Sequence, residues 1–573
     1  MLTRIQIIAV IIIAVLVGGA VRGQQPSPAA ASCTALGMQR IAPDKIGLPS
    51  RGAAIASTRL VPAAPETKVQ PSLLNPSGLR NALPEYCEVK GQILPIDPST
   101  PPINFQVNLP TDWNGKALQM GGGGWDGTLQ AADQGLFFLR APESLPYPLT
   151  RGYATFGTDG GHEGNDAAFA LNDEALTNFA YGHLKKAHDV AMALIRTRYN
   201  APPRRTYFVG QSGGGRQGLR VVQQFPQDYD GVVVTAPAIR YTNLMMRFND
   251  VATALAKPGA FLGPGQVTAF GAAVRAQCDM NDGVSDGIVG DYSACDFNPS
   301  VLRCKSGEAS SDCFSEAQIE SLAAVYRETV WKDAKGNVIV SYPRFLLGGG
   351  EALAGGLGAI IGRVPMPRPQ PPGRMAALVQ LGVGGMLAYG NTGVRYLIAR
   401  DGSFDTVGFD HRPYAPRIVE AVKLLSTDDP NLSRFQERGG KLIILHNTSD
   451  LAVTPASTID YYNNVVKTMG ASKVQQFARL YIVPGGDHGG FNTPSKTDLL
   501  GALEKWVEAG QSPGNNLVVE EDNPDRSVMR TKPLCAFPTY PRYIGQGDPK
   551  VASSYRCTEI SRKVEPYVGT PGN

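Results

Sequence analysis

The strongest chemical signal in the sequence is the pentapeptide Gly210-Gln211-Ser212-Gly213-Gly214, which fits the pattern G-x-S-x-G. An apolar run at Thr206–Val209 precedes it, and a helical pattern begins at about Gly214. In a strand–turn–helix setting, this turn holds the serine in strained backbone geometry and projects its hydroxyl away from the sheet. The N–H of Gly213 would then point to where an oxyanion forms. The motif therefore predicts Ser212 as the nucleophile of an acyl transfer.

A serine nucleophile needs a histidine base, and three histidines follow Ser212 in the chain: His411, His446 and His488. His488 comes just after an apolar run at Arg479–Val483, in a glycine-rich turn that could deliver an imidazole to the strand ends. His446 also ends a strand but precedes any plausible acid, and His411 lies in an irregular central segment. Any one of them could be an ordinary surface or core residue. The position after a strand favours His488.

The base needs an orienting carboxylate, and Asp450 is the best-placed candidate. It lies just beyond the predicted strand Lys441–Leu445 and far enough before His488 to allow one helix and one strand between them. Asp487 is adjacent to His488, so we expect its side chain to point away and to have a structural role. The predicted triad is Ser212, Asp450 and His488.

A second glycine cluster, Gly121-Gly122-Gly123-Gly124, follows the predicted strand Ala117–Met120. It resembles the HGGG-type loop that supplies the second N–H of an oxyanion hole. The alternative is a flexible surface turn. A dinucleotide site is excluded because no G-x-G-x-x-G opens a helix here with an acidic residue about twenty positions later.

An acidic turn within Cys278–Ile288 places Asp279, Asp282 and Asp286 among glycines. Oxygen ligands on a tight glycine turn suit Ca²⁺. The turn is not an EF-hand, because the spacing differs and no Glu closes the loop. A solvated acidic turn without metal remains the alternative.

Apolar runs alternate with helical patterns along much of the chain, which favours an α/β fold with a parallel sheet covered on both faces. The pattern breaks between about residues 240 and 431, a block that looks like an insertion between two strands. The predicted strands are Ile103–Leu109, Ala117–Met120, Ala154–Gly157, Thr206–Val209, Gly231–Thr235, Lys441–Leu445 and Arg479–Val483, and the predicted helices are Leu176–Arg198, Gly215–Gln224, Thr458–Gly470 and Thr497–Glu508.

The chain has 573 residues, of which 43% are hydrophobic and 18% charged, and this excludes a disordered protein or a long coiled coil. The net charge of +4 gives little support to a nucleic-acid partner. Arg4, the apolar run Ile7–Val17 and the small residues after it predict a signal peptide cleaved between Ala20 and Ala31. An uncleaved membrane anchor is the weaker alternative, because a span normally needs about 20 apolar residues. We expect a secreted or periplasmic protein with no stable membrane association.

The eight cysteines fit an oxidising compartment, and the absence of any CxxC pair argues against structural zinc. Sequence neighbours suggest the local pairs Cys278–Cys295, Cys304–Cys313 and Cys535–Cys557, which leaves Cys33 to pair with Cys87. Many other pairings are possible from sequence alone.

In combination, these motifs resemble the tannase/feruloyl esterase family, over about Cys33 to Cys557. The resemblance rests on the elbow Gly210–Arg216, the Gly121–Gly124 loop, Asp159-Gly160-Gly161-His162, the acidic Cys278–Cys295 loop and Pro484-Gly485-Gly486-Asp487-His488. It implies an α/β-hydrolase core with a large inserted lid domain. The corresponding boundaries are a signal peptide at 1–23, a linker at 24–32, the first part of the core at 33–239, a lid with the calcium loop at 240–431 and the second part of the core at 432–573.

The resemblance also implies roles for single residues. Ser212, Asp450 and His488 would be nucleophile, acid and base, and Gly124 and Gly213 would supply the oxyanion N–H groups. A structural Ca²⁺ would be held by Asp279, Asp282, Asp286 and the carbonyls of Val284 and Ile288, and the disulfides would pair as above. The expected activity is that of a secreted serine carboxylesterase for small aromatic esters, feruloyl or galloyl. The alternatives are a hydrolase of terephthalate-type monoesters and a non-catalytic binding protein on a hydrolase scaffold.

Two departures from the family pattern concern the site. The family typically joins cysteines next to the serine and the histidine in a disulfide, whereas this chain has Gln211 and Gly489 there. A hydrogen bond from Gln211 could substitute for the bridge. In the lid, Arg395 and Arg400 are candidates to bind a substrate carboxylate. Tyr389, Tyr396 and Phe404 could instead form an aromatic wall, or simply pack within the lid.

Overall fold

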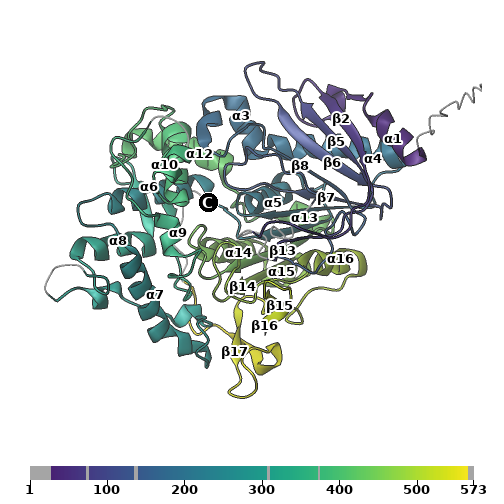
Figure 1. The fold of residues 1–573 in the computed structure, drawn as a ribbon. Helices are drawn as coiled ribbons and strands as arrows, with labels where there is room; N and C mark the ends of the chain where they lie inside the picture. The colour runs from purple at the N-terminus through teal and green to yellow at the C-terminus, as the bar shows by residue number, and fades with distance from the viewer. Residues whose placement is uncertain (1–26, 72–76, 134–139, 306–309, 372–374, 565–573) are drawn as a thin grey trace, which may run out of the picture.

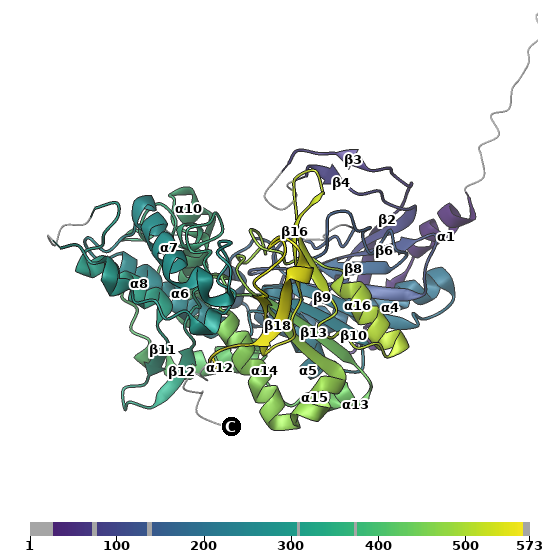
Figure 2. The same cartoon turned by 90° about the horizontal axis from the view of Figure 1, so that it is seen from below.

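The computed structural model describes residues 27–71, 77–133, 140–305, 310–371 and 375–564. The predicted signal peptide and the first residues of the predicted linker lie outside this range. Figure 1 shows a central sheet flanked by helices, with a largely helical block beside it, and Figure 2 shows the same arrangement from below. In the described part of the chain, no helix has the length and apolar character that a membrane crossing requires.

The main sheet has ten strands in the order β1-β2-β5-β6-β8-β7-β9-β10-β13-β14. From β8 to β14 the neighbouring strands are parallel. Every predicted strand is present, so the α/β fold is confirmed. The bounds are β1 (Arg40–Ile41), β2 (Ala53–Val61), β5 (Tyr86–Ile93), β6 (Ile103–Pro110), β7 (Lys116–Met120), β8 (Ala154–Thr158), β9 (Arg205–Gln211), β10 (Gly231–Thr235), β13 (Lys441–Asn447) and β14 (Ala478–Val483).

The predicted parallel sheet is present from β8 to β14, but the N-terminal side of the sheet is antiparallel. The pairs β1–β2, β2–β5, β5–β6 and β6–β8 are antiparallel, which makes the sheet mixed. β2 and β5 escaped prediction because β2 is only partly buried and β5, although mostly buried, carries Glu88 and Lys90. Across this pair, Arg59 binds the Glu88 carboxylate at 3.1 Å. Antiparallel strands with polar or charged residues lack the continuous apolar run of buried parallel strands.

Helices cover both faces of the parallel part of the sheet. α5 and α14 pack on one face through residues such as Leu219 and Ile459, and α16 packs on the other through Leu503 and Trp506. The predicted helices are all present, and the first contains a π-helical turn at Asn178–Gly182. The bounds are α3 (Asp173–Thr177), α4 (His183–Tyr199), α5 (Gly213–Gln224), α13 (Ser433–Glu437), α14 (Pro455–Met469), α15 (Ala471–Phe477) and α16 (Leu499–Ala509).

Between β10 and β13 the chain forms the block that stands beside the sheet in both views. Its helices share one apolar cluster, in which Phe248 of α6, Phe270 of α7 and Leu387 of α11 are buried. We call residues 241–425 the lid. Its elements are α6 (Tyr241–Leu255), α7 (Pro264–Cys278), α8 (Glu316–Tyr326), β11 (Thr329–Lys332), β12 (Val338–Tyr342), α9 (Leu357–Ile361), α10 (Met375–Gln380), α11 (Gly385–Thr392) and α12 (Ala415–Leu425).

The four predicted disulfides are all present: Cys33–Cys87, Cys278–Cys295, Cys304–Cys313 and Cys535–Cys557. A native disulfide ordinarily stabilises a fold by about 2–4 kcal/mol. The last of them joins the segment before β17 (Thr539–Tyr543) to β18 (Tyr555–Glu559). These strands pair with each other, as do β15 (Val518–Asp522) and β16 (Val528–Pro533), so the end of the chain adds two hairpins that the sequence patterns did not predict.

The structure differs from the predicted linker in its second half. Helix α1 spans Pro28–Leu36, so the chain is already helical at Ser32. The side chain of Ser27 accepts a hydrogen bond from the N–H of Ala30, and proline occupies the first turn. Both features start helices. The buried disulfide of Cys33 then holds the helix against β5.

Candidate active site

The elbow at Ser212 is the turn between β9 and α5. Ser212 has a φ of 60°, a strained value for a residue with a side chain. The strain is held by backbone hydrogen bonds: its N–H donates to the carbonyl of Thr235 at 3.0 Å, and its carbonyl accepts from the N–H of Ala238. Glycine is required at 210, because a Cβ there would lie 2.2 Å from the carbonyl oxygen of Gly214. Strand and helix therefore approach closely enough to make the sharp turn.

The candidate base and acid meet at the same edge of the sheet. β9, β13 and β14 are parallel, so the residues that follow their carboxyl ends are neighbours. His488 Nδ1 lies 2.7 Å from Asp450 Oδ2. The second carboxylate oxygen of Asp450 accepts the N–H groups of Ala452 and Val453 at 2.9 and 2.8 Å. Asp450 is therefore a fully hydrogen-bonded carboxylate behind the imidazole.

Asp450 is buried, which alone would raise its pKa. The positive charge available at His488 and the hydrogen bonds from His446 and His488 outweigh burial and hold the pKa of Asp450 well below its ordinary value. An ionised carboxylate at this position fixes the tautomer of His488 and stabilises its protonated form.

His446 is a contact of Asp450 that the sequence did not reveal. Its Nε2 lies 3.2 Å from Asp450 Oδ2 and 3.0 Å from the carbonyl of Val453, and its Nδ1 lies 2.8 Å from the hydroxyl of Thr458. Because both neighbours of Nε2 are acceptors, this nitrogen carries the proton. His446 is fully buried, is not among the residues that line the cavity in front of Ser212, and orients Asp450. Its burial excludes it as a base for substrate.

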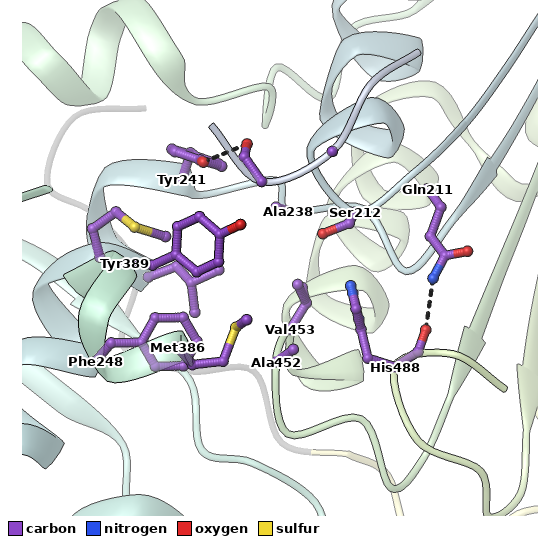
Figure 3. A pocket seen from close by; sticks show the side chains of 14 residues that line it. Gln211, Ser212, Ala238, Tyr241, Phe248, Met386, Tyr389, Ala452, Val453 and His488 are labelled. Atoms are coloured by element: carbon purple, nitrogen blue, oxygen red, sulfur yellow. Dashed lines mark hydrogen bonds between the residues drawn. The ribbon is translucent and has the colours of Figure 1, made fainter. Parts of the chain in front are cut away.

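Ser212 and His488 face the same cavity, as Figure 3 shows, but no hydrogen bond joins their side chains in the described structure. Such bonds often tighten only when substrate binds. The His488 loop is held by its backbone: the carbonyl of His488 accepts from Gln211 Nε2 at 2.7 Å and from the Arg140 guanidinium. Gln211 therefore joins the elbow to the histidine loop by a hydrogen bond, as the sequence suggested. A Cβ at Gly489 would collide with the ring of Phe491, at 2.3 Å.

Asp487 also holds this loop. Its Oδ1 accepts the N–H groups of Gly489 at 2.9 Å and Phe491 at 3.1 Å. The side chain thus folds back on its own turn and leaves the imidazole of His488 to face the cavity.

The glycine loop after β7 lies against the elbow. A Cβ on Gly213 would be 3.2 Å from the nitrogen of Gly124, so the two predicted oxyanion groups are neighbours. Tyr241 donates its hydroxyl proton to the carbonyl of Gly124 at 2.7 Å, a bond drawn in Figure 3. Asn165 Oδ1 accepts the N–H of Trp125 at 3.0 Å. The peptide between Gly124 and Trp125 is thus bonded through both its carbonyl and its N–H, which fixes the loop next to the predicted oxyanion N–H of Gly124.

The buried carboxyl group of Asp126 supports the glycine loop. The N–H of Asp126 donates to the carbonyl of Gly123, and Asp126 Oδ2 accepts from Gln217 Nε2 at 2.7 Å. Gln217 Oε1 in turn accepts the N–H of Gly122. Burial raises the pKa of Asp126 to about 7, although the nearby Arg216 opposes the shift. No motif pointed to this residue.

The Asp159–His162 motif is structural in this chain. Asp159 accepts from the backbone and side chain of Asn104 and from the N–H of Gly161. His162 is buried and stacks on Phe169, with ring centroids 3.8 Å apart. Neither residue lines the cavity.

The cavity in front of Ser212 has a volume of about 210 Å³. Its walls are apolar apart from a few hydroxyl, amide and imidazole groups, and none of its lining residues is an arginine or lysine. The lining residues are Gly123, Gly124, Gln211, Ser212, Ala238, Tyr241, Leu244, Met245, Phe248, Met386, Tyr389, Ala452, Val453 and His488.

Of the lid residues predicted to contact substrate, one lines the cavity and the others do not. Tyr389 lines the cavity, whereas Tyr396 and Phe404 pack within the lid. Arg395 is buried and donates to the carbonyl of Phe404 at 3.1 Å. Arg400 pairs with Asp173 at 2.8 Å. The structure therefore gives both arginines other partners, away from the cavity.

The acidic loop is pinned by the Cys278–Cys295 disulfide, but its carboxylates bond mainly to the loop itself. Asp279 accepts from Ser285 and from the N–H of Gly287, and Asp286 pairs with the buried Lys532 ammonium at 2.9 Å. In the described residues, no three His, Cys, Asp or Glu side chains already converge as a metal site would require. Asp282 differs: it is buried, its Oδ2 has no hydrogen-bond partner, and burial raises its pKa to about 7.

Known proteins resemble this chain over most of its length. The family model for tannase and feruloyl esterase matches residues 87–558. An uncharacterised esterase of Agrobacterium fabrum is 35% identical over 93% of this chain and 94% of its own. The mono(2-hydroxyethyl) terephthalate hydrolase of Piscinibacter sakaiensis is 28% identical over 83% of this chain and 85% of its own.

Among solved structures, feruloyl esterase B from Aspergillus oryzae superposes with a TM-score of 0.72 at 26% identity, covering 92% of this chain and 99% of that one. Both the sequence match and the fold extend across the core and the lid. The chain therefore belongs to the tannase and feruloyl esterase family and is a carboxylic ester hydrolase.

Proposed function

We propose that this protein is a secreted serine esterase that hydrolyses esters of uncharged aromatic acids, feruloyl or other hydroxycinnamoyl and galloyl esters first. The observation that carries the proposal is the apolar cavity in which Ser212 and His488 face the same space, with Asp450 bonded behind the imidazole. The names of the relatives point to aromatic esters as a class.

In the proposed mechanism, His488 Nε2 takes the proton of Ser212 Oγ as that oxygen attacks the ester carbonyl. The carbonyl oxygen becomes an oxyanion that accepts the N–H groups of Gly124 and Gly213. His488 then gives its proton to the departing alcohol, which leaves an acyl-enzyme on Ser212. A water molecule activated by His488 attacks that ester, the acid is released, and Ser212 regains its proton.

The character of the cavity supports an uncharged acyl group. A terephthalate monoester would bring a free carboxylate, and burying an unpaired carboxylate costs several kcal/mol. None of the lining residues is a lysine or arginine, and the structure places Arg395 and Arg400 elsewhere. We therefore rank terephthalate-type monoesters below hydroxycinnamates and gallates. A non-catalytic binding role is disfavoured by the strained, intact elbow.

We also propose that the acidic loop binds a structural Ca²⁺. The donor set fits a hard cation, because Asp279, Asp282 and Asp286 supply carboxylates, Val284 and Ile288 supply backbone carbonyls, and a buried oxygen of Asp282 lacks a partner. The ion would stabilise the loop. No step of the ester chemistry needs it.

A location outside the cytoplasm, secreted or periplasmic, is part of the same proposal. It is supported by the leader-like start of the sequence and by the four disulfides, which persist in oxidising compartments.

The test is hydrolysis of methyl ferulate, methyl gallate, the hydroxyethyl monoester of terephthalate and a short p-nitrophenyl ester by the wild type and by Ser212→Ala. We expect turnover of the ferulate or gallate ester that disappears in the variant. Activity only on the p-nitrophenyl ester would refute the aromatic assignment. Activity that survives in Ser212→Ala would refute the triad.

A further inference from the structure

Tyr389 is the side chain through which the lid reaches the glycine loop. It belongs to α11 and lines the cavity, and a Cβ on Gly124 would lie only 2.3 Å from its hydroxyl oxygen. The phenol oxygen therefore lies beside the peptide that offers the predicted oxyanion N–H. Figure 3 shows the hydroxyls of Tyr389 and Ser212 directed toward the space between them.

The hydrogen bonds of Asn165 determine whether the Tyr389 hydroxyl donates or accepts at this contact. The amide atom 3.0 Å from the N–H of Trp125 must be the oxygen, because a backbone N–H can only donate. The other amide atom is then the nitrogen, and it lies 2.6 Å from the Tyr389 oxygen. The phenol oxygen is thus an acceptor toward Asn165.

This arrangement leaves the proton of Tyr389 for another partner. No acceptor for it is present in the described part of the chain, where the hydroxyl bonds only to Asn165. Burial raises the pKa of Tyr389 above its ordinary value, so the hydroxyl keeps its proton at neutral pH. Tyr241 is not available in this way, because its hydroxyl already donates a hydrogen bond to the carbonyl of Gly124.

Resting on the serine-esterase function proposed above, we propose that Tyr389 is a catalytic residue of the lid, whose hydroxyl donates a third hydrogen bond to the ester carbonyl oxygen as that oxygen becomes negative. The bond adds to those from the N–H groups of Gly124 and Gly213 and involves no transfer of the proton. A donor of this kind acts on the transition state more than on bound substrate, so it affects kcat more than KM.

The first experiment compares Tyr389→Phe with Tyr414→Phe, a lid tyrosine outside the cavity. For the best ester of the panel, kcat of Tyr389→Phe should fall about 10- to 100-fold with KM within about twofold. The Tyr414→Phe variant should match the wild type, and all three proteins should have the same melting temperature. An unchanged kcat, or an effect confined to KM, would overturn the proposal.

A second measurement separates this inference from the function on which it rests. An aryl boronic acid forms a tetrahedral adduct with a reactive serine, whereas the uncharged amide of ferulic acid is a ground-state ligand. Tyr389→Phe should weaken boronate affinity about tenfold and leave the affinity for the amide unchanged. Absence of wild-type turnover on the whole panel overturns the proposed function, whereas equal boronate affinity in wild type and variant overturns the role of Tyr389.

A third variant, Asn165→Asp, keeps an oxygen for the Trp125 N–H but replaces the donor to Tyr389 by a second acceptor. The Tyr389 proton should then turn to the carboxylate, and kcat should fall as in Tyr389→Phe. In a Tyr389→Phe background the same change should have a smaller effect. Equal effects in both backgrounds would show that the lost rate does not pass through Tyr389.

Discussion

The cavity has two walls that are built by different interactions. The core wall carries Ser212, His488 and Gly124, and each is held by directional hydrogen bonds. The partners are Thr235 and Ala238 for Ser212, Gln211 for His488, and Tyr241 of α6 for Gly124. The lid wall, from α6 and α11, presents mainly apolar side chains such as Phe248 and Met386. Directional bonds fix atoms within tenths of an ångström, whereas apolar contacts tolerate changes of shape. We infer that the core wall determines the reaction and the lid wall determines the acyl group.

The two walls are not independent, because the lid also touches the loops of the acid and the base. The N–H of Gly350 donates to the hydroxyl of Ser449 at 3.1 Å, next to Asp450. Gly485, in the histidine loop, lies against Ile288 of the acidic loop, where a Cβ would be 3.1 Å from that side chain.

The largest effect should come from Asp450→Asn. An amide at this position cannot stabilise the protonated imidazole and favours the wrong tautomer of His488, so kcat should fall about 10³- to 10⁴-fold. The matched control is Asp487→Asn, which keeps an oxygen for the N–H groups of Gly489 and Phe491 and should lose less than about tenfold. Steady-state kinetics on the ester that the wild type hydrolyses best measures both losses. Similar losses in the two variants would contradict the assignment of Asp450.

A smaller, selective effect is expected from the lid wall. Met386→Ala removes apolar contact from the cavity without touching the core wall, so kcat/KM for an aromatic ester should fall about 10-fold while that for a short aliphatic ester changes little. Met375→Ala, a lid methionine outside the cavity, serves as control. A uniform loss on both esters would mean that the lid wall acts on the reaction rather than on the acyl group.

The core wall was also the more predictable wall from the sequence. The elbow is a local pattern of strand, turn and helix, so Ser212 could be recognised from neighbouring residues alone. Asp450 and His488 could be predicted because each follows a buried parallel strand. His446, Tyr241 and Asp126 could not, because their roles depend on contacts between segments far apart in the chain.

The lid was predictable only as a block. Its helices bury apolar residues on irregular faces and share one cluster, so spacing does not indicate which side chains reach the cavity. Tyr389 and Tyr396 lie in the same stretch of sequence, yet only Tyr389 lines the cavity. The antiparallel strand β2 was missed for a related reason, because a partly buried strand without an apolar run carries little signal.

Gln211→Leu tests the link between the elbow and the histidine loop. The change removes the hydrogen bond to the His488 carbonyl, which the Arg140 guanidinium continues to hold. We therefore expect kcat to fall between about twofold and tenfold, because the net value of one such bond is about 1 kcal/mol. Kinetics at two temperatures should show a larger loss at the higher one. A loss as large as that of Asp450→Asn would mean that Arg140 alone cannot hold the loop.

Removal of calcium tests whether the acidic loop supports the core wall through Ile288 and Gly485. Chelation should lower the melting temperature by about 2 °C, and added Ca²⁺ should restore it, because a ligand present at 100 times its Kd stabilises the folded state by about 2.7 kcal/mol and a chain of this length shifts by about 1 °C per kcal/mol. Asp282→Asn should abolish the response. Differential scanning fluorimetry with and without chelator measures both. A melting temperature that does not change with chelator would indicate that the Lys532 ammonium, rather than a metal ion, balances the negative charge of the acidic loop.

The smallest expected effect is on the pH dependence of stability, to which two buried carboxyl groups contribute with opposite sign. Asp450 has a lowered pKa, so its contribution to stability is present above about pH 4 and is lost as the pH falls. Asp126, which faces Arg216 and Asp159, has its pKa raised to about 7, so the folded protein binds its proton more tightly than the unfolded chain does. Its contribution is present below about pH 4 and is lost as the pH rises toward 7.

Asp126→Asn removes this dependence while keeping an oxygen for Gln217. Between pH 5 and pH 8 the free energy of unfolding of the variant should therefore improve relative to wild type, by on the order of 2 kcal/mol. Urea unfolding at the two pH values measures the difference. Asp159→Asn should improve by less, because burial raises the pKa of Asp159 only to about 6. If wild type and variant respond equally to pH, the charge of Arg216 compensates an ionised Asp126 fully. The glycine loop would then rest on an ion pair rather than on a protonated acid.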